Sequence, residues 1–231
     1  ELVEEELEVQ FTDERLKTLP LLILLMIRRA QKGKLISYSF KVNYRELTDT
    51  KEYLAADRVI WDVEDLSENE RVYLTMLLLT TNLSRGDILS VKAINKMKEA
   101  LKQVIANFER IAGVNLEDKE KLLDRLLVHM RPAYYRIKYH LNLQTRFYQE
   151  NKDANLFSLF YLVKEAAGPL ETYFEQSVPD AELFFISLFI GSHIVESSEI
   201  IHPENRKKAI IVCPNGVSIA ALLENTLRNL L

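Results

Sequence analysis

The stretch LLDRLLVHMRPAYYRIKYHL, residues 122–141, predicts the helix around which the rest of the chain is organised. At about 100° per residue, its apolar side chains fall on one helix face; they are Leu126, Met130, Ala133 and Ile137. His129 and Arg136 lie on the border of that face, and Arg125 lies on its polar side. An imidazole on such a border would be within reach of a partner protein and could accept a phosphoryl group, because guanidinium groups lie nearby to bind the added charge.

Pro132 lies inside the same predicted helix and predicts a local kink beside His129, because proline has no N–H for the carbonyl of Val128. Arg131 points away from His129 on an ideal helix and would join it only if the kink turns it inward. A structural role for His129 is the alternative, since a helical histidine beside arginines is more often a packing or solvated residue than a reactive one.

Composition excludes several classes of protein. The 231 residues carry 30 basic and 34 acidic side chains, and the net charge of -4 is not that of a typical nucleic-acid-binding domain. The longest apolar run, residues 19–27, is shorter than the roughly 20 residues that cross a bilayer, and no cleavable signal is present. The single cysteine, Cys213, cannot form an internal disulfide, and no Cys/His cluster has metal-site spacing. We therefore expect a cytoplasmic protein with no membrane span, metal or other cofactor.

Helical periodicity continues on both sides of the 122–141 stretch. Glycine and proline number six each, which favours helices over a many-stranded sheet. The expected helices are at residues 1–11, 12–29, 50–60, 68–83, 91–112, 118–140, 155–167, 170–176 and 181–195. Ser67 and Glu70 form a capping-box pattern, and Pro20 is expected to kink or break its helix.

These helices form two similar sets. Arg29 and Arg136 close apolar stretches 107 residues apart, and Glu70-x-x-Tyr-Leu-Thr resembles Glu182-x-x-Phe-Ile-Ser at a spacing of 112 residues. Two close offsets from separate motifs predict a duplicated domain of about one hundred residues. The alternative is a chance alignment of two apolar helices. We place the two predicted domains at residues 1–110 and 111–203.

The chain changes in character from residue 204 to residue 231. In order, it predicts a short buried strand, a tight loop and a helix, at residues 209–212, 213–217 and 218–231. A thiolate at Cys213 would face backbone N–H groups at a helix N-terminus, where Gly216 permits close approach and Ser218 adds a hydroxyl. We expect the opening of an α/β domain that stops before its sheet is complete, since a parallel sheet needs a crossover to a second strand.

In this order, the motifs resemble those of a known family. The stretch HMRPAYYRIKYHL, the repeated E-x-x-Y-L-T pattern and the terminal VCPNGVSIAALL are similar to bacterial transcription regulators with tandem phosphotransferase-system regulation domains and an enzyme IIB-like domain. The likeness is nearest to mannitol-operon and lichenan-operon activators and covers essentially the whole chain. It implies an all-α fold of two tandem helical bundles that dimerise, followed by the opening strand, loop and helix of a truncated α/β enzyme IIB-like domain.

The same resemblance implies how the protein is controlled. Such regulators have an N-terminal DNA-binding region, which we expect to be missing here, so that DNA would be bound only through a region absent from this chain. The sugar phosphotransferase system's HPr or enzyme II components phosphorylate histidines of the regulation domains. His129 matches the first such histidine of the second domain, and Arg136 matches the arginine that follows it. Cys213 matches the phosphorylatable cysteine of the enzyme IIB-like loop, although Ala220 stands where a serine is often found.

The other expected phosphorylation positions are apolar in this chain. The second histidine of the second domain falls at Phe189, and His193, one turn later, is a poor substitute. In the first domain the two positions fall at Leu22 and Leu77. His129 is therefore the main candidate for phosphate control.

We predict a sensor and dimerisation module rather than an enzyme, in which phosphorylation of His129 changes a helix-bundle interface and sets the activity of the DNA-binding region. The residues expected to support a phosphate are Arg125, Arg131 and Arg136 at His129, and Gly216 and Ser218 at Cys213. Two alternatives remain: a phosphoryl carrier that uses Cys213 covalently, and a scaffold that has lost phosphate control. Direct nucleic-acid binding is disfavoured by the net charge.

Overall fold

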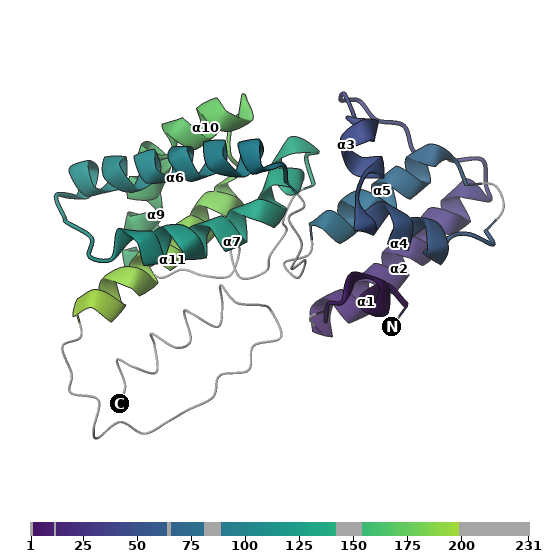
Figure 1. The fold of residues 1–231 in the computed structure, drawn as a ribbon, viewed down its shortest axis with the longest axis horizontal. Helices are drawn as coiled ribbons and strands as arrows, with labels where there is room; N and C mark the ends of the chain where they lie inside the picture. Colours follow the sequence, from purple (N-terminus) through teal and green to yellow (C-terminus); the bar gives the residue numbers. More distant parts are fainter. Residues whose placement is uncertain (1, 12, 64–65, 81–88, 142–153, 199–231) are drawn as a thin grey trace, which may run out of the picture. The chain divides into compact units, whose positions relative to one another are not determined.

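The computed structural model describes residues 2–11, 13–63, 66–80, 89–141 and 154–198. Within these ranges the chain is helical and contains no strand, in agreement with the all-α prediction (Figure 1). The strand, loop and helix predicted between residues 204 and 231 lie outside the described residues. The described residues form two compact units: the first holds those up to Ser90 with Pro132–Leu141, and the second holds those in Val91–Arg131 and 154–198.

Several helices of the first unit start at a side-chain cap. Its described helices are α1 (Leu2–Leu7), α2 (Asp13–Ala30), α3 (Tyr44–Thr48), α4 (Lys51–Val59) and α5 (Glu68–Leu79). Thr50 Oγ1 accepts a hydrogen bond from the Tyr53 N–H at 3.1 Å and starts α4. Ser67 and Glu70 form the predicted capping box at the start of α5. The helix starts thus reflect short-range chemistry.

The apolar core of the first unit lies between α2, α4 and α5. Its buried side chains include Leu19, Met26, Ala55, Ala56, Ile60, Leu74 and Leu78. Pro20 lies inside α2, which still runs as one helix from Asp13 to Ala30, so the helix does not break there. Pro20 and Leu16 are exposed, and water can therefore hydrate the Leu16 carbonyl that loses its N–H partner.

The second unit is a bundle of longer helices. Its described helices are α6 (Val91–Ala112), α7 (Lys119–Lys138, up to Arg131), α9 (Ala154–Ala166), α10 (Gly168–Phe174) and α11 (Asp180–Ser198). Figure 1 shows these helices gathered side by side. Gly113, with a φ of 67°, ends α6, because glycine adopts this left-handed conformation without a steric penalty. The domain boundary predicted at residue 110 falls in the last turn of α6 and stays a prediction, as does the boundary at residue 203.

The two units share a pattern of helix packing. In the first unit α4 packs against both α1 and α5, and in the second unit α9 packs against both α6 and α11. The motifs that suggested a duplication lie on matching helices, since Glu70 is in the first turn of α5 and Glu182 is in the first turn of α11. The packing is therefore in keeping with two helical bundles of one kind.

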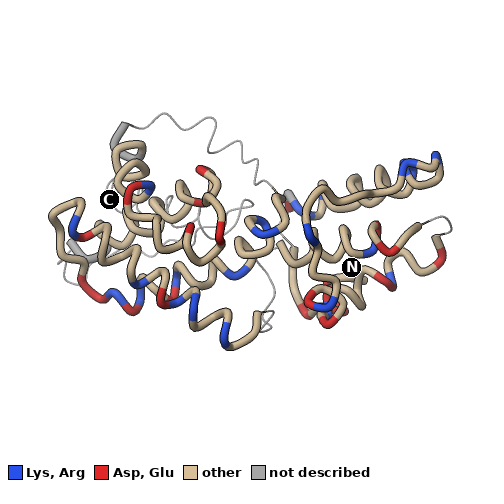
Figure 2. The backbone as a smooth tube through the Cα atoms, turned by 90° about the horizontal axis from the view of Figure 1, so that it is seen from above, with Lys and Arg blue, Asp and Glu red and all other residues tan. Residues whose placement is uncertain are grey.

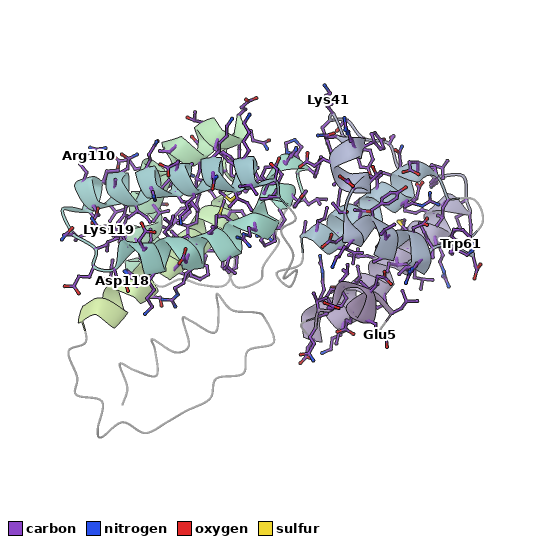
Figure 3. The ribbon with its side chains drawn as sticks, in the orientation of Figure 1. Glu5, Lys41, Trp61, Arg110, Asp118 and Lys119 are labelled. Atoms are coloured by element: carbon purple, nitrogen blue, oxygen red, sulfur yellow. The ribbon has the colours of Figure 1, made fainter. Side chains whose placement is uncertain are left out.

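Charged residues of both signs are interspersed along the described helices of each unit (Figure 2). Trp61, the single tryptophan of the chain, is 74% exposed and points away from the first unit (Figure 3). Among the described helices, none combines the length and the apolar composition that crossing a membrane requires. The described residues also hold no group of three or more His, Cys, Asp or Glu side chains placed to bind a metal ion.

Candidate functional site

His129 lies on α7 and faces the interior of the second unit. The residue is 6% exposed, whereas the neighbouring Val128 is 62% exposed. The sequence analysis placed the imidazole on an accessible border of the helix, and this part of the prediction is wrong. The reason is tertiary: α11 is apolar around most of its circumference, and its aromatic side chains cover the edge of α7 that a single-helix projection leaves open.

The polar partner of His129 is the carboxylate of Glu182 on α11. The Nε2 and Oε2 atoms are 3.1 Å apart, and the two side chains are 4% and 2% exposed. The rings of Phe185 and Phe189 lie on the same helix as Glu182, each with its centroid 5.5 Å from that of the imidazole. A buried hydrogen bond in apolar surroundings is costly to break from one side, because the remaining group is left without water.

The three arginines predicted to support a phosphate at His129 occupy different surroundings. Arg125 and Arg131 are half-buried on α7. Arg136 is 5% exposed and belongs to the first unit, where its Nη1 donates to the backbone oxygen of Thr80 at 3.2 Å. Among the described contacts, His129 bonds to a carboxylate rather than to a guanidinium group. The role of these arginines in holding a phosphate stays a prediction.

The positions of the first unit that the sequence analysis matched to phosphorylatable histidines hold leucines. Leu77 is 8% exposed and Leu22 packs against the same core. Arg15 donates from Nη2 to the backbone oxygen of Leu77 at 2.7 Å and to Thr80 Oγ1 at 2.9 Å. The guanidinium group thus holds the C-terminal end of α5, where a positive charge is favourable.

The remaining histidines and the predicted thiol site are placed as follows. His193 is 3% exposed, and its Nε2–H donates to the backbone oxygen of Glu117 at 2.6 Å, as expected for a packing residue. His140 is exposed and lies edge-on to the Phe40 ring. The predicted site residues Cys213, Gly216 and Ser218 lie outside the described residues, as does His202.

Sequence reasoning missed Glu182 as a member of the site. Glu182 was used only to align the two repeats, although its recurrence could have pointed to a buried polar role. A glutamate recurs in the first turn of two helices whose remaining turns are mostly apolar, and a carboxylate that is buried there needs a polar partner.

The sequence model of the PRD domain matches residues 1–81 and 102–193 of the chain. These ranges cover more than half of its length. The chain belongs to the PRD domain family. Glu70 and Leu77 lie in the first matched range of the PRD family, and His129, Glu182 and Phe189 lie in the second.

Two bacterial regulators are similar to this PRD chain. It is 26% identical to the transcriptional regulator ManR of Bacillus subtilis (strain 168) over 222 residues, which cover 92% of the chain and 33% of ManR. It is 27% identical to the probable licABCH operon regulator of the same organism over 192 residues, 78% of the chain and 28% of that regulator. The PRD chain thus spans about a third of the length of these relatives. No solved structure gives a significant match.

Proposed function

We propose that this chain is the regulatory part of a transcription regulator controlled by the sugar phosphotransferase system, and that His129 is its phosphorylation site. The PRD match and the two similar regulators support the regulatory role. The assignment of His129 depends on one observation: this histidine, retained in the second repeat, lies at the contact between α7 and α11. The DNA-binding region is part of the proposal, because the chain spans about a third of its relatives' length.

A phosphoryl group at His129 would change this contact strongly. Phosphorylation adds roughly -1.5 to -2 charges at neutral pH, and the Glu182 carboxylate already lies 3.1 Å from Nε2. Between Phe185 and Phe189 these two anionic groups would have no water to screen them. Phosphorylation and the packed form of α7 against α11 therefore exclude each other, which is the basis of a two-state switch.

Phosphoryl transfer requires this contact to open, because His129 is 6% exposed in the packed form. In the open form Arg125, one turn before His129 on the same helix, would come within reach of the phosphate and give charge-assisted hydrogen bonds. Arg131 would follow if its side chain turns toward the same edge, and Arg136 would leave Thr80. These movements are the means by which we expect the phosphate to alter the bundle.

The partners in this proposal are HPr or enzyme II components as phosphoryl donors, and a second copy of the chain in a homodimer, all in the cytoplasm. Cys213 is the site proposed for a second phosphorylation, in an enzyme IIB-like domain, with Gly216 and Ser218 beside it. The transfer would place the phosphoryl group of a donor phosphohistidine or phosphocysteine on the acceptor side chain, with the donor side chain as leaving group.

A second candidate function is a PRD scaffold without phosphate control. The burial of His129 against Glu182 and the apolar residues at Leu22, Leu77 and Phe189 favour it. In that case the pair of His129 and Glu182 would serve only to join α7 to α11.

The test is phosphorylation of the purified chain with enzyme I, HPr and labelled phosphoenolpyruvate, followed by mapping of the label. We expect labelled His129 and its loss in His129→Ala. His193→Ala is the matched control, because His193 is equally buried but bonds to a backbone oxygen. Label on Cys213 alone, lost in Cys213→Ala, would favour the carrier alternative. No label on a folded chain would favour the scaffold.

A further inference from the structure

Glu70 and Glu182 occupy equivalent places and use their carboxylates differently. Each is the third residue of its helix, α5 or α11, and each is 1% exposed. Glu70 accepts hydrogen bonds from the Ile36 N–H at 2.5 Å and the Ser67 N–H at 3.1 Å. Glu182 instead faces the Nε2 atom of His129. The carboxylate at this position therefore caps a helix in the first unit and bonds to a histidine side chain in the second.

Pro179 explains why Glu182 cannot repeat the role of Glu70. The residue before α11 is Pro179, whose oxygen accepts the N–H groups of Glu182 and Leu183 at 2.9 and 3.2 Å. Pro179 thus takes the place that Ser67 has before α5, but proline has no N–H and no hydroxyl to offer a carboxylate. The reciprocal half of a capping box is chemically impossible here, and the Glu182 side chain is left to find another donor.

The position of Glu182 also suits a carboxylate that accepts a hydrogen bond. It lies in the first turn of α11, where the helix dipole stabilises a negative charge. An ionised carboxylate accepts hydrogen bonds and cannot donate one. The proton of the 3.1 Å contact therefore belongs to the imidazole, on Nε2. A neutral ring with its proton on Nε2 has its lone pair on Nδ1.

We infer that Glu182 is the positioning residue of His129: it holds the proton on Nε2 and leaves Nδ1 as the nitrogen that accepts phosphate. The part concerning phosphate rests on the proposed function. In the transfer, the Nδ1 lone pair forms the new N–P bond while the P–N bond of a phosphohistidine donor breaks. The donor imidazole leaves with the electron pair, and the Nε2 proton that Glu182 positions in the packed form stays on the His129 ring. A carboxylate that orients a reactive imidazole in this way acts through hydrogen bonding, without contacting the phosphoryl group.

The tautomer can be read without any phosphorylation, by two-bond ¹H–¹⁵N correlation spectra of the full chain with ¹⁵N-labelled histidine. His129→Ala identifies the His129 signals among those of the four histidines. We expect one tautomer, protonated on Nε2, in the unmodified chain. In Glu182→Gln the amide can donate or accept equally well, so this single tautomer should be lost. A proton on Nδ1 in the unmodified chain, or an unchanged tautomer in Glu182→Gln, would overturn the inference.

Two further variants separate positioning from simple packing. Pro179→Ser keeps Glu182 but gives it a competing N–H and hydroxyl, and we expect a mixture of tautomers. Glu70→Gln is the matched control, since it disturbs the equivalent buried carboxylate of the first unit, and it should leave the His129 spectrum unchanged. Far-UV circular dichroism establishes that each variant is folded. A His129 spectrum that responds to Glu70→Gln but not to Pro179→Ser would contradict the role assigned to Glu182.

The nitrogen that carries the phosphate is then determined in the chain phosphorylated by HPr, from long-range ¹H–³¹P couplings. Phosphate on Nδ1 in the unmodified chain, and a redistribution toward Nε2 in Glu182→Gln, would support the inference. Phosphate found only on Nε2 of the unmodified chain would overturn the inference and leave the proposed function intact. If His129 takes no phosphate, the proposed function fails together with the acceptor role of Nδ1, while the tautomer spectra still decide whether Glu182 holds Nε2.

Discussion

Side chains adjacent in the sequence cap three helices of the first unit, whereas the candidate site of the second unit is joined across the bundle. In the first unit Asn43, Thr50 and Ser67 cap the helices that start one residue later. In the second, His129 and Glu182 are 53 residues apart in sequence. Local caps form whenever their helix forms, whereas the His129–Glu182 pair exists only while α7 and α11 are packed. The second unit therefore carries the helix contact that phosphorylation of His129 could open.

Alkaline pH should distinguish the units most strongly. Burial raises the pKa of four tyrosines of the first unit, with that of Tyr139 at about 12; the other three are Tyr38, Tyr134 and Tyr135. A tyrosine whose pKa is higher in the folded state than its ordinary value of 10 gives stability that is complete below pH 10 and is lost as the pH rises through the folded value. We expect the first unit to unfold in this range, measured by tyrosinate absorbance and circular dichroism.

The control for this titration is Tyr135→Phe, because Tyr135 is fully buried and its ring stacks with Tyr139. Removing one phenol should move the alkaline transition to higher pH. Tyrosinate absorbance that develops in full without any loss of helix would contradict the assignment.

His129→Leu makes the second unit resemble the first at the position of Leu22, and we expect it to be strongly destabilising. The change removes the imidazole that bonds to the buried Glu182 carboxylate. Pro179, the residue before α11, has no N–H to replace it. Breaking one side of a buried pair typically costs about 3–5 kcal/mol. Urea unfolding followed by circular dichroism measures the loss. Adding Pro179→Ser should recover about 1 kcal/mol by restoring a capping box.

Val128→Leu is the matched control for His129→Leu, since Val128 directly precedes His129 in α7 and is 62% exposed. It should change the free energy of unfolding by less than about 0.5 kcal/mol. Equal effects at the two positions would mean that the pair of His129 and Glu182 contributes nothing specific.

Gly191→Ala tests how closely α9 and α11 approach in the second unit. A methyl group at Gly191 would lie 2.9 Å from Leu159 Cδ2, so the Leu159 side chain has to move. Overpacking of this kind costs about 1–3 kcal/mol, from which a gain of about 1 kcal/mol in helix propensity is subtracted. Thermal unfolding should show a modest loss of stability. Leu159→Ala in the same chain should remove the clash, and a Gly191→Ala variant more stable than the parent would refute the close approach.

Ser67→Ala should have the smallest effect of the four predicted changes, and this effect should be confined to the first unit. It removes the hydroxyl that accepts the Asn69 N–H at 3.2 Å, and loss of such a cap costs about 1 kcal/mol. Amide hydrogen exchange read by mass spectrometry should show faster exchange at the start of α5. Exchange around His129 should stay at its original rate, and a change there would contradict the separation of the two sites.

The sequence alone determined much of the helical framework. The capping pattern of Ser67 and Glu70 and the amphipathic pattern of residues 91–112 both gave helices close to the predicted bounds. These features depend on residues within one or two turns of each other, so a sequence pattern contains the needed chemistry. Pro20 shows the limit of such rules, because an exposed proline can be tolerated where water replaces the lost hydrogen bond.

Only the tertiary structure decided the surroundings of the candidate site. The sequence pointed to His129 as the main candidate and put arginines beside it on one helix, but it could not show that α11 covers the ring or that Glu182 is its partner. The physical reason is that a helix projection describes one helix, whereas burial and hydrogen bonding depend on which face of another helix meets it. Pro179 and Glu182 can be read from the sequence, but their effect on His129 depends on the packing of α7 against α11.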